Sequence, residues 1–168
     1  GMMISAIARA ARILDNEEYG KHAIKAMDFI LKNLKQEDGQ LLKRYRNGKS
    51  GLDGVLDDYA YVIWGLIELY QYNFDINYLN NSILFSDYQI KHFWDNQNGG
   101  FYFNSDIAEK LLIRSKEIYD GAIPSGNSVS ANNFIKLGRI LSRIDYEDIS
   151  NNLIESFGKK INRYGPAY

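Results

Sequence analysis

The chain has 168 residues, of which 45% are apolar and 24% are charged, and its formal net charge is −1. This size suits one globular domain with a hydrophobic core, and the balanced charge excludes the basic surface that holds nucleic acid or an anionic membrane. No run of about 18 apolar residues is present, which excludes a membrane-spanning helix, and the absence of cysteine excludes disulfides and thiolate metal sites. We therefore expect a single domain over residues 1–168 and, without a signal-peptide pattern, a cytoplasmic location.

Six helices are predicted from the spacing of the apolar residues. Three amphipathic helices with one solvated face are expected at 17–35, 77–94 and 148–161. Three more apolar helices alternate with them, at 2–14, 56–72 and about 125–142. The helix at 56–72 carries apolar side chains in nearly every direction, which is typical of a helix that is buried on all sides.

A glycine-containing loop follows the second and the fourth of these helices. The two loops, at Gly39 and at Gly99-Gly100, are about 60 residues apart, and a period of that order indicates stacked helical units. A short strand is predicted at 41–46, ending at the turn Asn47-Gly48, and a second strand pair at 101–104 and 110–115.

The alternation of apolar and amphipathic helices predicts an inner and an outer layer. Short connections make the helices of each pair antiparallel, and such hairpins arranged in a circle give an α/α toroid. Closed toroids need about six hairpins, whereas this chain has three. We expect an all-α fold, a partial α/α toroid of about half an (α/α)6 barrel, with short β-hairpins in the loops.

Three segments carry a resemblance to a known family. They are Leu-Asp-Gly-Val-Leu-Asp-Asp-Tyr-Ala at 52–60 with its continuation to 70, Phe-Trp-Asp at 93–95 leading to Gly-Gly-Phe-Tyr-Phe at 99–103, and Arg-Ser-Lys-Glu at 114–117 with 119–128. In this order they closely resemble the large thioredoxin-domain-containing proteins related to spermatogenesis-associated protein 20. In that family a six-hairpin glycosidase-like barrel follows a thioredoxin-like domain, and the barrel is similar to N-acylglucosamine 2-epimerases and cellobiose epimerases.

The resemblance extends from residue 3 to about residue 137 and covers only a central part of the family's barrel. It implies that the thioredoxin-like domain and the remaining hairpins belong to a full-length parent. It further implies that a site built across the whole barrel is incomplete in this chain. If the parent is active, the resemblance implies a glycosidase-like or sugar-epimerase-like activity, but it supplies no catalytic residues for this sequence.

The inner helices begin at the mouth of such a barrel, where free backbone N–H groups gather. Asp57 and Asp58 are paired acids at one of these helix starts and could act as general acid and base; the alternative is helix capping. Glycosidases place two carboxyls about 5 to 10 Å apart, and Glu117 with Asp120 or Asp57 is a candidate pair; the alternative is a salt-bridged loop. The same rim supplies the candidates for substrate binding: Asp53, Asp58, Tyr59, Lys116, Ser125, Asn127 and Ser128.

The two histidines offer no metal site. His22 and His92 fall on outer helices, away from the expected mouth, so neither a metal nor a cofactor is expected.

Two functional hypotheses remain. The first is a carbohydrate-active-like barrel fragment that binds a saccharide without holding a complete active site. The second is a non-catalytic scaffold that docks a thioredoxin-like domain or another partner. Because three hairpins leave the outermost helices without lateral neighbours, self-association is expected through the edge that carries Met3, Ile7 and Ile13.

Overall fold

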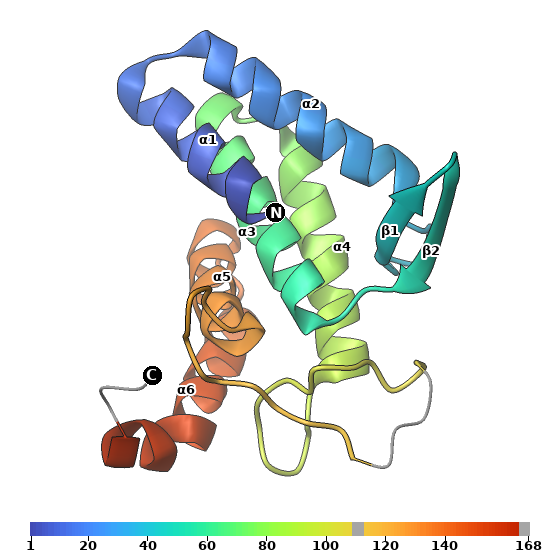
Figure 1. The fold of residues 1–168 in the computed structure, drawn as a ribbon. Helices are drawn as coiled ribbons and strands as arrows, with labels where there is room; N and C mark the ends of the chain where they lie inside the picture. Colours follow the sequence, from blue (N-terminus) through green and yellow to red (C-terminus); the bar gives the residue numbers. More distant parts are fainter. Residues whose placement is uncertain (109–112, 165–168) are drawn as a thin grey trace. The chain divides into compact units, whose positions relative to one another are not determined.

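The computed structural model describes residues 1–108 and 113–164, with side chains described up to residue 158 (Figure 1). The elements that it describes are α1 (Met2–Leu14), α2 (Glu17–Asn33), β1 (Leu42–Arg46), β2 (Lys49–Asp53), α3 (Leu56–Asn73), α4 (Ile76–Phe93), α5 (Gly126–Leu141) and α6 (Ile144–Tyr164). They fall into two compact units. The first unit comprises residues 1–54 and 61–88, and the described part of the second comprises 55–60, 89–108 and 113–164.

In the first unit α1 and α2 pack as a helical hairpin (Figure 1). Asn16 ends the connection and caps α2, because its side chain accepts hydrogen bonds from the N–H groups of Glu18 and Tyr19. Gly20 lies against the ring of Tyr72 so closely that a Cβ atom has no space. A larger residue at this position would have to displace the Tyr72 ring, where α2 packs on α3.

The β1–β2 hairpin confirms the strand and the turn that were predicted at 41–48. Leu42 pairs with Asp53 and Arg46 with Lys49 in an antiparallel register. Asn47 and Gly48 have φ values of 51° and 74°, the left-handed conformation that two-residue hairpin turns require.

The second predicted strand pair does not form in the same way. Within 101–104 the chain makes one bridge, between Phe101 and Trp94, and the Phe103 N–H donates to the Ser115 carbonyl at 2.8 Å. The strand predicted at 101–104 is therefore wrong, and its predicted partner at 110–115 falls partly outside the described residues.

Helix α3 is buried on nearly all sides, as predicted. Ile63, Glu68 and Leu69 are at most 2% exposed, although they point in different directions around the helix. The prediction for α4 is only half right. Leu79 and Phe93 are buried as expected, but Ile83 and Ile90 are half-buried.

Polar side chains occupy much of the buried face of α4 instead. Ser82, Ser86 and Gln89 are fully buried. The Ser82 hydroxyl bonds the carbonyl of Leu79 at 2.7 Å, and Gln89 Nε2 donates to Ser130 Oγ at 2.6 Å. These two bonds offset the cost of burying the Ser82 hydroxyl and the Gln89 amide nitrogen, and apolar spacing alone does not detect them.

In the second unit α5 and α6 pack as a hairpin whose connection is very short. Ser142 ends α5 with φ 55°, and α6 begins at Ile144, four residues before the predicted start at 148. Aromatic rings from both helices and from the preceding loop pack together in the core of this unit. Phe101 stacks on Phe134 at 5.5 Å, and Phe134 meets Tyr146 edge-on at 5.2 Å.

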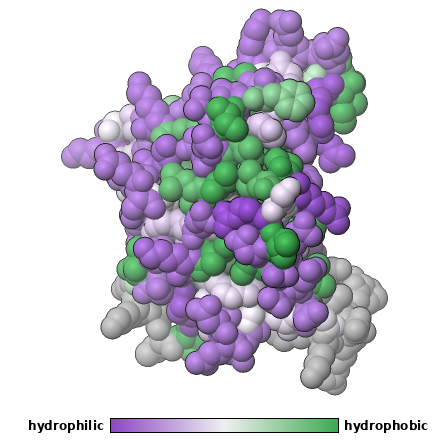
Figure 2. All heavy atoms as spheres, turned by 180° about the vertical axis from the view of Figure 1, so that it is seen from behind, coloured by the Kyte–Doolittle hydropathy of each residue, from purple (hydrophilic) through white to green (hydrophobic). Residues whose placement is uncertain are grey.

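Several large apolar side chains stay exposed. Figure 2 shows apolar side chains interspersed among polar ones over one face. On α1, Met3 is 70% exposed, Ile13 66% and Leu14 64%.

None of the described helices combines the length and the apolar character needed to cross a membrane. The single domain predicted over 1–168 stays a prediction, because two compact units in one chain do not show whether either folds alone.

Candidate functional site

The starts of α3 and α5 lie side by side in the second unit, as the sequence predicts. Asp57 Oδ1 accepts a hydrogen bond from the N–H of Gly126 at 2.9 Å. A Cβ atom at Gly126 would overlap Asp57 Oδ1 and lie 2.8 Å from Leu56 Cγ. The missing side chain at Gly126 thus allows the two helix starts to touch, and Asp57 joins them.

Asp58 caps its own helix. Its Oδ2 accepts the N–H of Val55 at 2.9 Å, three residues earlier, which is the reciprocal bond of a capping box. Of the two roles that the sequence leaves open for Asp58, the geometry supports capping.

Two other predicted binding residues make different contacts. Tyr59 is 1% exposed, and its ring packs against Phe93 with centroids 5.1 Å apart. Asp53 belongs to the first unit, where its carboxylate accepts from Gln40 Nε2 at 2.9 Å on the exposed hairpin. Tyr59 therefore presents no surface to a ligand, and Asp53 is an exposed hairpin residue.

Asn127 is buried and acts as a clamp. Its Oδ1 accepts the N–H of Phe101 at 2.9 Å, and its Nδ2 donates to the carbonyls of Phe101 at 3.0 Å and Glu117 at 2.7 Å. Because both amide donors are used on the backbone, the side chain fixes the first turn of α5 to two preceding segments. Glu117 itself is exposed, and its carbonyl rather than its carboxyl makes this contact.

Lys116 forms an ion pair with Asp95. Its Nζ donates to Asp95 Oδ2 at 2.6 Å and to the Gly99 carbonyl at 2.5 Å. The Lys116 hydrogen bond, helped by the N–H of Gln97 and by Asn98 and Tyr102, holds the pKa of Asp95 well below its usual range despite burial. The hydrogen bond to Asp95 in turn raises the pKa of Tyr102.

Asp95 belongs to a segment that carries the family resemblance, but it was not among the candidate site residues predicted from the sequence. The turn composition that follows Asp95 could have revealed it, since an aspartate at the start of a turn commonly accepts the N–H two residues on, as Asp95 does from Gln97. Asp95 is 6% exposed and organises the loop that the sequence treats only as a connection.

A cavity of about 210 Å³ opens beside the first turns of α5. It is lined by Ile118, Asp120, Asn127, Ser128, Ala131, Leu153, Ile154 and Phe157. Asp120 is exposed, and its Oδ1 accepts the N–H of Ser125 at 2.8 Å. Ser125 caps α5 by accepting the N–H of Ser128, and the two hydroxyls lie 3.0 Å apart. The cavity therefore combines an apolar floor with a carboxylate and a hydroxyl at its edge.

This volume is smaller than the roughly 300–1,000 Å³ of most small-molecule pockets. It suits a single ring or one part of a larger site. Of the ten predicted site residues, the cavity holds Asp120, Asn127 and Ser128, with Ser125 directly behind them.

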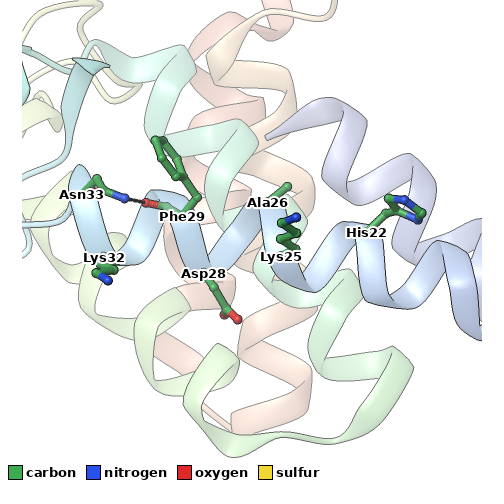
Figure 3. A pocket seen from close by; sticks show the side chains of 7 residues that line it. All are labelled: His22, Lys25, Ala26, Asp28, Phe29, Lys32 and Asn33. Atoms are coloured by element: carbon green, nitrogen blue, oxygen red, sulfur yellow. Dashed lines mark hydrogen bonds between the residues drawn. The ribbon is translucent and has the colours of Figure 1, made fainter. Parts of the chain in front are cut away.

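A larger hollow of about 660 Å³ follows α2 in the first unit (Figure 3). All of its lining residues come from this one helix, and in Figure 3 Phe29 and Asp28 point to opposite sides of it. The dashed bond joins Asn33 Nδ2 to the Phe29 carbonyl at 2.8 Å. Without convergent polar groups or a facing wall, this surface does not form a ligand site.

The histidines lie where the sequence puts them, on α2 and α4. His92 Nδ1 is 2.8 Å from Asp106 Oδ1, and His22 Nδ1 is 2.7 Å from the Glu18 carbonyl. In the part of the chain that the structure describes, no three His, Asp or Glu side chains are grouped so that they could hold a metal ion.

Comparisons with known proteins give a consistent picture of the fold. No family model matches the chain. Spermatogenesis-associated protein 20 of Rattus norvegicus is 30% identical over 97% of the chain, which spans 22% of that protein's length. A GH76 alpha-mannanase of Bacteroides thetaiotaomicron superposes with a TM-score of 0.74 at 14% identity, covering 94% of this chain and 42% of its own. An unsaturated glucuronyl hydrolase of Bacillus sp. GL1, responsible for the degradation of glycosaminoglycan, superposes with a TM-score of 0.71 at 12% identity. The superposition covers 92% of this chain and 44% of the hydrolase.

These similarities confirm the predicted fold class. The chain has the all-α fold of part of an α/α toroid, as in these six-hairpin glycosidases, and it is homologous to part of a thioredoxin-domain-containing protein. The solved structures are too distant in sequence to carry more than the fold to this chain.

Proposed function

We propose that this chain, a homologue of part of spermatogenesis-associated protein 20, forms one portion of a saccharide-binding α/α barrel and binds a sugar ring without cleaving it. The cavity beside α5 carries this proposal. Saccharide sites combine hydroxyl and carboxylate groups at an edge with an apolar floor for the sugar's C–H face, and Asp120, Ser128 and Phe157 supply these features. The fold neighbours named above act on carbohydrates by their names, which supports the same chemistry.

The lack of a complete active site is the second part of the proposal. Asp57 and Asp58 each bond a backbone N–H, and Lys116 is paired with Asp95. Two-carboxylate hydrolysis needs a pair of acids that face one bond from opposite sides. In a longer protein that carries the whole barrel, we propose that residues outside this chain complete a glycosidase-like or epimerase-like centre. A cytoplasmic location is proposed with it, on the cysteine-free composition alone.

Titration of the isotope-labelled chain with neutral mono- and disaccharides, followed by NMR, tests the binding. We expect the amide signals of Asp120, Ser128 and Ala131 to shift at millimolar sugar. Ala131→Leu fills the cavity and should abolish the shifts, whereas Ala26→Leu, the same change at an exposed alanine of α2, should retain them. The absence of saturable shifts with any of the sugars contradicts the proposal.

An interaction scaffold is a second candidate, and the exposed edge of α1 favours it. Met3, Ile13 and Leu14 each expose more than half of their surface on one short helix. We propose that this edge mediates self-association or docks a thioredoxin-like domain of a full-length parent. Light scattering should detect a concentration-dependent oligomer that Ile13→Lys dissociates. A monomer at high concentration, with no binding of an added thioredoxin-like domain, contradicts this candidate.

A further inference from the structure

The first turn of α5 already has acceptors for the backbone donors that would otherwise bind an anion. The N–H of Ser125 is bound by Asp120 Oδ1 at 2.8 Å, and that of Gly126 by Asp57 Oδ1 at 2.9 Å. The N–H of Ser128 is bound by Ser125 Oγ at 3.2 Å. Two of these three acceptors are carboxylates, so the partial positive charge of the helix start is compensated from within the chain.

Among the residues that the structure describes, the cavity beside this turn has no compensating cation. None of its described lining residues is a lysine or an arginine. Lys116 belongs to the same unit, but its Nζ is bound by Asp95 Oδ2 and by the Gly99 carbonyl. Arg114 is likewise held on the carbonyls of Asn104 and His92 and over the ring of Tyr102, at 4.1 Å from its centroid. A ligand in the cavity would therefore meet the charge of Asp120 without a positive group among the described lining residues.

From this charge distribution we infer that the cavity accepts an uncharged or amino-bearing sugar ring and rejects a uronic acid, an inference that rests on the proposed saccharide binding. A carboxylate on the ligand would lie within a few ångströms of Asp120 and lose its own hydration. Both effects oppose binding. A hydroxyl or ammonium group at the same position would instead donate a hydrogen bond to Asp120, and for the ammonium this bond is charge-assisted.

Three ligands with the same ring test the inference: methyl glucoside, methyl glucosaminide and methyl glucuronide, titrated into the full chain at neutral pH and low salt. We expect the glucuronide to bind about tenfold more weakly than the glucoside, and the glucosaminide at least as tightly. Added salt should narrow the difference, because exposed charges about 5 Å apart are partly screened.

Asp120→Asn isolates the charge from the shape of the site. The amide oxygen still accepts the N–H of Ser125, so the loop is preserved while the negative charge is removed. We expect this variant to bind the glucoside and the glucuronide within about twofold of each other. The control is Asp148→Asn, which removes an exposed carboxylate of α6 that does not line the cavity, and it should keep the wild-type ratio.

The outcomes distinguish failure of the inferred charge selectivity from failure of the proposed saccharide binding. Equal binding of glucoside and glucuronide by the wild type, or an unchanged ratio in Asp120→Asn, overturns the charge selectivity while saccharide binding stands. If none of the three ligands binds, the proposed function fails and the inference fails with it.

Discussion

Replacement of Asp95 by alanine is the sharpest test of how the second unit is held together. The carboxylate is 6% exposed and accepts from the N–H groups of Gln97 and Asn98, from Asn98 Nδ2, from the Tyr102 hydroxyl and from Lys116 Nζ, at 2.6 to 3.2 Å. Asp95→Ala removes all of these acceptors. It leaves the ammonium group of Lys116, whose side chain is 17% exposed, with the Gly99 carbonyl and the ring of Tyr102 as described partners.

The expected loss of unfolding free energy follows from these contacts. Removal of one partner of a buried ion pair costs about 3–5 kcal/mol, because the other charge stays desolvated. Each hydrogen bond to a charged group contributes about 1.5–3 kcal/mol, but bonds that share one carboxylate are not additive. Lys116 can regain some water, so we expect a loss of about 3 kcal/mol. That is a large share of the roughly 5–15 kcal/mol that stabilises a domain.

Urea denaturation followed by tryptophan fluorescence and circular dichroism measures this loss. Trp94 adjoins Asp95 and packs edge-on against Phe101 at 4.9 Å, so its emission reports on the loop. Lys116→Met is the comparison: Asp95 keeps its backbone donors there, and the loss should be smaller than in Asp95→Ala. A loss under about 1 kcal/mol in Asp95→Ala, or a larger one in Lys116→Met, would refute the reasoning.

Three further predictions concern stability. The hydrogen bond from Lys116 lowers the pKa of Asp95 in the folded chain below its ordinary value of 3.8. The carboxylate therefore stabilises the fold above about pH 4, and this stabilisation is lost as the pH falls. Measured by chemical denaturation, the fall in unfolding free energy between about pH 5 and pH 3 should be shallower in Asp95→Asn than in the wild type. Gly126→Ala should destabilise by about 2 kcal/mol or more, because its Cβ overlaps Asp57, and an unchanged melting temperature would contradict the close contact. Gly158→Ala, whose Cβ meets no described atom within 4 Å on α6, should stabilise by up to about 1 kcal/mol, and a lower denaturation midpoint would count against it.

The helices could be predicted from the sequence because their signals are local. Apolar spacing defines α1 and α2 to within two residues. The start of α6 was wrong by four residues because the left-handed residue before it is Ser142, which carries no glycine signal.

The site was harder to predict because the same residue types occur in ligand-binding sites and in structural hydrogen bonds. Asn127 belongs to the residue types that bind sugars, yet it pairs with the backbone of Phe101, which is 26 residues earlier in the chain. Asp95 is the opposite case: it lies in a loop without a catalytic pattern, yet its carboxylate accepts five hydrogen bonds. Only the tertiary contact decides between a ligand-binding and a structural role, and a single sequence does not contain that contact.

The contact between Asp57 and Gly126 also decides where a ligand has room. The sequence directs attention to the space between the starts of the two apolar helices, but a glycine without room for a Cβ and a carboxylate on its N–H show that protein atoms fill that space. The other side of the same α5 turn faces α6, where Ala131 and Leu153 leave an opening and Asp120 stands at its edge. Close packing on one side fixes the turn rigidly, and a rigid turn can present Asp120 and Ser128 to a ligand without a further ordering cost. The residues that close the expected site are therefore those that support the proposed one.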